Sequence, residues 1–130
     1  MNPVAEPAIR VLLADDDQRY LDSLRELVDR QPELAVVGAA RDGLEVIELA
    51  DELDPDAVVI DLHMPRLDGV AAVQRLRSDH PHLCLIALTG DGAPDLHRAA
   101  TGAGADAVLL KEEILDALLE RLSRAGRRVG

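Results

Sequence analysis

The chain has 130 residues, a net charge of −11 at pH 7 and a pI of about 4.6. It is 48% hydrophobic but holds one tyrosine, no phenylalanine and no tryptophan, so its core must be aliphatic. This composition excludes a disordered chain, and the length corresponds to one domain. A chain this acidic is not expected to bind nucleic acid directly, and the lack of aromatic residues argues against a base-stacking module.

The sequence also predicts the cellular location of the protein. Its single cysteine, Cys84, excludes a disulfide framework and fits a reducing compartment. The first ten residues lack the basic and apolar regions of a signal peptide. The longest unbroken apolar run, Leu83–Leu88, is far shorter than the ~18 residues that suggest a membrane span. We therefore expect a cytoplasmic protein with no membrane segment.

Short apolar runs alternate with segments whose apolar residues recur at helical spacing. The runs do not alternate with polar residues, which is typical of strands buried on both faces of a parallel sheet. The helical spacing is least regular between Thr89 and Gly104, where glycines are frequent. We expect this segment to be the most mobile part of the fold. In chain order the pattern predicts a strand at Val11–Ala14, a helix over Tyr20–Val28, a strand at Leu34–Val37, a helix over Leu44–Ala50, a strand at Ala57–Ile60, a helix over Val70–Leu76, a strand at Leu83–Leu88, a short helix over Asp95–Ala100, a strand at Ala107–Leu110 and a helix over Ile114–Leu122.

Five successive strand–helix units predict an α/β domain of (βα)5 type, with a doubly wound parallel five-stranded sheet and right-handed crossovers. We expect one domain over residues 9–125. Residues 1–8 are expected to form a flexible N-terminal tail, and residues 126–130 either a C-terminal tail or the start of a linker. Asp42 and Asp68 are the expected N-caps of the second and third helices.

The residues that follow the predicted strands carry the chemistry. The first strand runs into three consecutive aspartates at positions 15–17, and the others into Asp61, Thr89–Gly90 and Lys111. In open α/β sheets ligands bind at the carboxyl ends of the strands, so these side chains converge if the first and third strands are neighbours. Crowded carboxylates repel one another, and a divalent cation such as Mg²⁺ removes that repulsion. The set therefore predicts a phosphoryl site.

Each residue type suits a step of phosphoryl chemistry. A carboxylate can act as the nucleophile and form an aspartyl phosphate. The Lys111 ammonium neutralises phosphate charge, the Thr89 hydroxyl donates a hydrogen bond, and Gly90 adds no bulk.

Several segments of the chain resemble the receiver domain of bacterial two-component response regulators. The resemblance extends over roughly residues 9–125, and it implies the flavodoxin-like (CheY-like) strand order 2-1-3-4-5. The segments that carry it are Val11-Leu12-Leu13-Ala14-Asp15-Asp16, Asp61-Leu62-His63-Met64-Pro65-Arg66-Leu67-Asp68-Gly69, Leu88-Thr89-Gly90 and Gly104-Ala105-Asp106-Ala107-Val108-Leu109-Leu110-Lys111.

The resemblance implies a role for each matching residue. Asp61 corresponds to the phosphoacceptor, and Thr89 and Lys111 correspond to the switch hydroxyl and the phosphate-binding lysine. The implied Mg²⁺ ligands are Asp15, Asp16, Asp61 and the backbone carbonyl of His63.

The resemblance also implies partners. The implied reaction is phosphoryl transfer from a sensor histidine kinase or phosphotransfer protein onto Asp61, with later hydrolysis. Such a domain is a signalling phosphoacceptor rather than a turnover enzyme. It acts alone or as the regulatory part of a transcriptional regulator, through a downstream output domain or protein, with phosphorylation-dependent homodimerisation as an option.

Three positions depart from the family pattern. Val108 stands where an aromatic switch residue is common, Glu112 where proline is common, and Gly90 where alanine is common. The missing aromatic at Val108 and the missing proline at Glu112 favour an alternative, a pseudo-receiver that binds a partner without being phosphorylated. A third hypothesis is a hydrolase with an aspartyl nucleophile. Such an enzyme commonly needs a second acid, and the position of that acid holds His63 here.

Each site residue also has a structural interpretation. The three consecutive aspartates are compatible with a helix N-terminus, and Asp17 is the expected cap. Thr89 could serve only a turn and Lys111 only a strand end, whereas the His63 side chain is expected at the surface near the site.

Overall fold

The computed structural model describes residues 8–64, 66–90, 92–111 and 120. Five parallel strands form one sheet in the order β2-β1-β3-β4-β5, as expected. The elements are β1 (Ile9–Ala14), α1 (Gln18–Asp29), β2 (Leu34–Ala40), α2 (Gly43–Leu53), β3 (Ala57–Asp61), α3 (Gly69–Asp79), β4 (Cys84–Thr89), α4 (Pro94–Ala103) and β5 (Ala107–Leu110).

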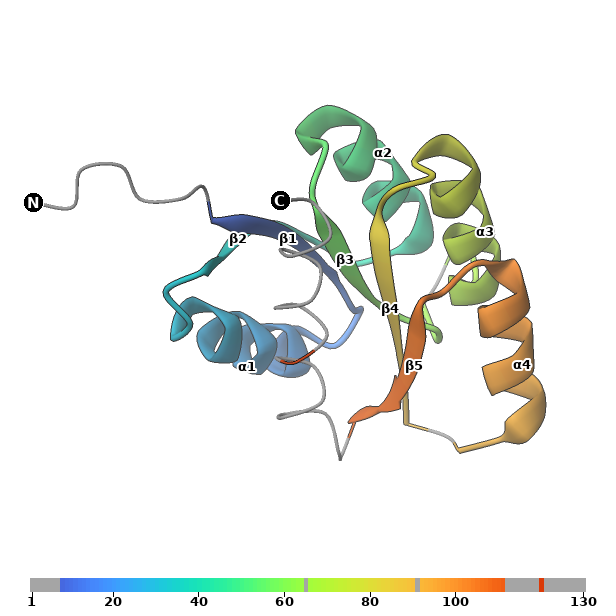
Figure 1. Cartoon of the computed structure of the whole chain (residues 1–130). Coiled ribbons are helices and arrows are strands. Elements are labelled where there is room, and N and C mark those ends of the chain that lie inside the picture. The colour runs from blue at the N-terminus through green and yellow to red at the C-terminus, as the bar shows by residue number, and fades with distance from the viewer. Residues whose placement is uncertain (1–7, 65, 91, 112–119, 121–130) are drawn as a thin grey trace, which may run out of the picture.

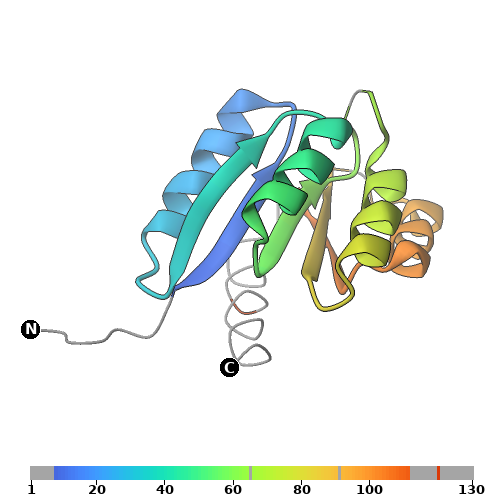
Figure 2. The same ribbon diagram turned by 90° about the horizontal axis from the view of Figure 1, so that it is seen from above.

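Helices cover both faces of the sheet (Figure 1). One face packs against α2, α3 and α4, which lie side by side in the view of Figure 2. The other face packs against α1. Neighbouring residues of β1 serve opposite layers: Leu12 belongs to the first core and Val11 and Leu13 to the second. Strand geometry requires this alternation, and it explains why the apolar runs are continuous.

Burial follows the place of each strand in the sheet. Every residue of β3 and β4 is buried, as the continuous apolar runs predict. The expectation of full burial is wrong for β2 and β5, whose residues are mostly half-buried. These two strands form the edges of the sheet, where each pairs with a neighbouring strand on one side alone.

Strand β2 is longer than the predicted Leu34–Val37 and continues to Ala40. Its pairing with β1 contains an irregularity, after which Leu12 lies opposite Gly38. A Cβ atom at Gly38 would lie 2.8 Å from Leu53 Cδ1 of α2. The lack of a side chain at Gly38 therefore leaves room for Leu53. The low strand propensity of the small residues that end β2 explains why the sequence did not predict this extension.

Three aspartates cap helices as predicted. The side chains of Asp17, Asp42 and Asp68 accept hydrogen bonds from backbone N–H groups in the first turns of α1, α2 and α3. Glu45 adds a second contact at the start of α2, since its Oε1 accepts from the backbone N–H of Arg41, the residue before the cap, at 2.7 Å. These caps satisfy donors that a helix leaves unpaired and fix where each loop ends.

Helix α4 is longer than the predicted Asp95–Ala100 segment and runs over Pro94–Ala103. Pro94 suits the first turn, and Gly104, with φ of 120°, ends the helix. Three of the predictions lie outside the described residues. They concern the helix at Ile114–Leu122, of which only Glu120 is described, the two terminal segments 1–8 and 126–130, of which only residue 8 is described, and Glu112.

Candidate functional site

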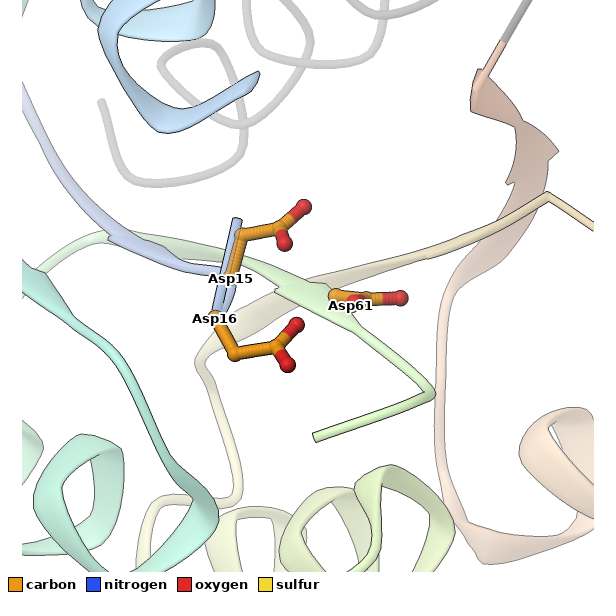
Figure 3. Close-up of side chains that lie close together, drawn as sticks. All are labelled: Asp15, Asp16 and Asp61. Carbon is orange, nitrogen blue, oxygen red and sulfur yellow. The ribbon is translucent and has the colours of Figure 1, made fainter. Parts of the chain in front are cut away.

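The carboxyl ends of the strands bring the predicted site residues together. Asp15 and Asp16 follow β1, and Asp61 is the last residue of the neighbouring β3. Their side chains point into one region (Figure 3), and three of their carboxylate oxygens, one from each residue, lie within 4.8 Å of one another. We call these three residues the carboxylate cluster. Lys111, which follows β5, reaches the same region.

Asp15 is the most deeply buried member of the carboxylate cluster, with none of its surface exposed. Its Oδ1 accepts a hydrogen bond from the backbone N–H of Asp17 at 2.9 Å. Its Oδ2 lies 2.7 Å from Lys111 Nζ as an ion pair, yet it is buried without a hydrogen bond of normal geometry. A buried carboxylate oxygen with unused acceptor capacity fits a hard cation such as Mg²⁺.

Asp61 is also buried, with 3% of its surface exposed. Its Oδ1 accepts from the backbone N–H of His63 at 3.1 Å, and its Oδ2 lies 3.4 Å from Lys111 Nζ. Burial and the charge of Asp15 raise the pKa of Asp61, although the His63 N–H and Lys111 favour its charged form. The carboxylate is therefore held in a site that disfavours its own negative charge.

Lys111 joins two members of the carboxylate cluster with a single ammonium group. Burial alone would lower the pKa of this lysine, but Asp15 and Asp61 outweigh burial and raise it. The ammonium is thus charged at neutral pH and occupies the space between the two buried acids. One ammonium beside a cluster of three carboxylates leaves the site with excess negative charge, which a divalent ion would offset.

The structure separates the roles of the three consecutive aspartates. Asp15 is buried, Asp16 is exposed, and Asp17 caps α1. The backbone carbonyl of Asp16 accepts a hydrogen bond from Arg41 Nη2 at 3.2 Å, which ties the loop after β1 to the loop after β2. Capping therefore explains Asp17 alone, as the sequence predicted.

Thr89 lies at the end of β4 with 3% of its surface exposed. Its Oγ1 lies 3.5 Å from Nε2 of His63, whose side chain is exposed as expected. The next residue, Gly90, faces open space, since a Cβ atom added there would meet nothing within 4 Å. The approach to Thr89 would stay open with alanine at this position too.

Tyr20 is a neighbour of the site that sequence reasoning assigned only to the apolar stripe of the first helix. Its hydroxyl donates a hydrogen bond to the backbone carbonyl of Lys111 at 3.2 Å. The centroid of its ring lies 4.5 Å from Lys111 Nζ. Burial, together with the charges of Asp15 and Asp61, raises the pKa of Tyr20 above its ordinary value of 10.0. The one signal in the sequence was that the chain's single tyrosine follows the first strand so closely.

Comparison with known proteins defines the class. The model of one family, described as the response regulator receiver domain, matches residues 11–123. The chain therefore belongs to the response regulator receiver domain family. Phosphorylation and Mg²⁺ binding are general to this family, whose domains pair with kinases and output domains in two-component systems.

The similar proteins include a methylesterase and a LuxR-family response regulator. A protein-glutamate methylesterase/protein-glutamine glutaminase of Thermotoga maritima is 32% identical over 94% of this chain and 38% of its own length. The crystal structure of the response regulator domain of Thermotoga maritima CheB matches with TM-score 0.84 and 30% identity, over 91% of this chain and 98% of that one. A LuxR-family two-component response regulator from Aurantimonas matches with TM-score 0.81 and 28% identity, over 89% and 86%.

The chain matches only part of the length of these methylesterases. The chain spans 38% of the Thermotoga methylesterase and 34% of a 34% identical methylesterase from Shewanella denitrificans. The similarity thus concerns the receiver part of those proteins. Among the described residues, no helix is long and apolar enough to cross a membrane.

Proposed function

We propose that Asp61 accepts a phosphoryl group from a phosphohistidine and that this modification is the signal the domain transmits. The observation that carries the proposal is the position of Lys111 Nζ, 2.7 Å from Asp15 and 3.4 Å from Asp61. A cation held beside a buried carboxylate can neutralise the phosphoryl oxygens that arrive there.

The residues placed to hold Mg²⁺ are Asp15, Asp16 and Asp61 through their carboxylates and His63 through its backbone carbonyl. The carboxylate cluster supports this assignment, since hard oxygen donors lie close together and Asp15 Oδ2 has unused acceptor capacity. Bound there, the ion would neutralise charge on the carboxylates and on the incoming phosphoryl group.

The transfer step follows from these positions. An Asp61 carboxylate oxygen attacks phosphorus while the phosphorus–nitrogen bond of the donor breaks, and the electron pair of that bond stays on the imidazole nitrogen. Lys111 moves its ion pair from the carboxylates to a phosphoryl oxygen. Hydrolysis later cleaves the phosphorus–oxygen bond and returns the Asp61 carboxylate and inorganic phosphate.

Thr89 and α4 supply the response to phosphorylation in this proposal. The Thr89 hydroxyl donates to a phosphoryl oxygen, and the movement biases a two-state equilibrium of the surface formed by α4 and β5. The partners are then a sensor histidine kinase or phosphotransfer protein and an output that reads this surface, with homodimerisation as one form of output. Identical hydrogen exchange of residues 90–104 with and without phosphorylation would contradict this step.

Intact mass after incubation with Mg²⁺ and acetyl phosphate tests the phosphoacceptor. We expect one added phosphoryl group on the native chain and on Asp22→Asn, which changes an exposed carboxylate of α1. We expect none on Asp61→Asn and none when a chelator removes Mg²⁺. Uptake by Asp61→Asn equal to that of the native chain would refute the assignment.

A beryllofluoride complex distinguishes the remaining case, because some receivers accept phosphoryl groups only from their kinase. Complex formation without uptake from acetyl phosphate supports a phosphoacceptor with a selective donor. Failure of both reactions would favour the pseudo-receiver, which binds a constitutive partner without phosphorylation.

A further inference from the structure

We propose that Tyr20 is a positioning residue that holds the Lys111 ammonium in place for phosphoryl transfer at Asp61. The inference rests on the proposed function and extends it to a residue of α1 outside the carboxylate cluster. Tyr20 makes two contacts with Lys111. Its hydroxyl contacts the backbone carbonyl of the lysine, and its ring contacts the side-chain ammonium.

The first contact places the ring. The Tyr20 hydroxyl donates to the Lys111 carbonyl at 3.2 Å, which joins the start of α1 to the end of β5. A phenol has few rotatable bonds, so one hydrogen bond at its tip and the helix at its base leave the ring little freedom. Asp17 fixes the base in turn, because its side chain accepts from the Tyr20 N–H at 3.4 Å.

The second contact acts on the ammonium. Lys111 Nζ lies 4.5 Å from the ring centroid, within the range of a cation–π interaction. A lysine side chain is long and flexible, and reaching one productive position costs it rotamer freedom. The ring covers one side of the ammonium and the carboxylates of Asp15 and Asp61 cover another, so few positions remain.

The contact of the Tyr20 ring with Lys111 is most important when the carboxylate cluster binds Mg²⁺. Mg²⁺ would compete with Lys111 for Asp15 and Asp61 and weaken the ion pairs that hold the ammonium. The face of Tyr20 carries no formal charge and does not bind Mg²⁺ by preference, so its hold on Lys111 persists through that exchange. Tyr20 therefore keeps the ammonium available for the phosphoryl oxygens.

The test compares phosphorylation rates with acetyl phosphate at saturating Mg²⁺. We expect Tyr20→Leu, which keeps apolar bulk but removes the ring, to lower the rate about fivefold, as a half-buried cation–π contact implies. Tyr20→Phe keeps the ring and loses only its hydrogen bond to the Lys111 carbonyl, so its rate should lie between those of the native chain and Tyr20→Leu. Equal losses in both variants, or no loss in Tyr20→Leu, would overturn the proposal.

Repeating both changes in a Lys111→Met background separates positioning from a general structural effect. If Tyr20 acts through Lys111, Tyr20→Leu should change the residual rate less than twofold in that background. A further fivefold loss there would mean that Tyr20 acts by another route and would overturn the inference.

An NMR measurement keeps the test independent of phosphoryl uptake. In a chain with no phenylalanine or tryptophan, an upfield ring-current shift of the Lys111 ε-protons has Tyr20 as its main source. We expect this shift in the native protein with Mg²⁺ and in Tyr20→Phe, and its loss in Tyr20→Leu. The shift without any modification of Asp61 would refute the proposed function alone, whereas its absence from the native protein would refute the role of Tyr20.

Discussion

Gly69, the first residue of α3, is the position where one added methyl group should disturb both stability and the site. A Cβ atom at this position would lie 2.3 Å from Leu62 Cα and 2.7 Å from the Leu62 carbonyl oxygen. These are backbone atoms of the residue after Asp61, and the Gly69 N–H already donates to that carbonyl at 3.1 Å. The clash therefore cannot be relieved by a change of side-chain rotamer.

Two opposing effects decide the outcome of Gly69→Ala. Alanine is favoured over glycine inside a helix by about 1 kcal/mol, and the effect is smaller at its first residue. Forcing extra volume into a packed interior costs about 1–3 kcal/mol, and a contact this short requires a backbone shift of about 1 Å. The clash outweighs the propensity, so we expect a net loss of about 1–2 kcal/mol in the free energy of unfolding.

Urea unfolding followed by far-ultraviolet circular dichroism measures this loss, with Gly102→Ala as the matched control. A Cβ atom at Gly102 in α4 would meet nothing within 4 Å, so there the propensity acts alone and should stabilise by about 0.5–1 kcal/mol. The shift of the Leu62–Gly69 loop should also slow phosphorylation of Asp61. Gly69→Ala as stable as Gly102→Ala would refute the reasoning.

Three other changes have expected outcomes. Mg²⁺ at a hundredfold excess over its Kd should raise the free energy of unfolding by about 2.7 kcal/mol in the native chain and by less in Asp16→Asn, as urea titrations with and without the ion would reveal. The pKa of Asp61 is raised in the folded chain, so ionisation of this carboxyl lowers the free energy of unfolding. The loss begins as pH rises above the unfolded-state pKa of about 3.9, and it is complete above the folded-state pKa. Asp61→Asn should accordingly be more stable than the native chain at pH 7, with the gap closing toward pH 4; a constant gap in thermal melts across that range would contradict this account. Arg77→Met should lose about 2 kcal/mol, because the guanidinium donates to the carbonyls of Pro81, Leu83 and Gly104 and to Asp106, and an unchanged urea midpoint would count against that network.

Local patterns in the sequence were sufficient for most of the fold. The continuous apolar runs of β3 and β4 could be recognised because both faces of a central parallel strand are buried. Asp17, Asp42 and Asp68 marked helix starts because capping involves residues only two or three positions apart. The end of β2 was missed, since its small residues have low strand propensity and the closeness of Gly38 to Leu53 of α2 is a tertiary contact.

The sequence predicted which residues reach the site, because parallel strands place their carboxyl ends at one edge of the sheet and the resemblance supplied the order that makes β1 and β3 neighbours. Only the tertiary structure decided how those residues meet. The ion pair of Lys111 with both Asp15 and Asp61 depends on how far the lysine reaches across the sheet from β5. The contact of Tyr20 with Lys111 joins residues 91 positions apart, and no periodicity within either segment encodes such a pairing. Residue types and strand order suffice to place an acidic site, whereas its charge balance comes from packing between distant elements.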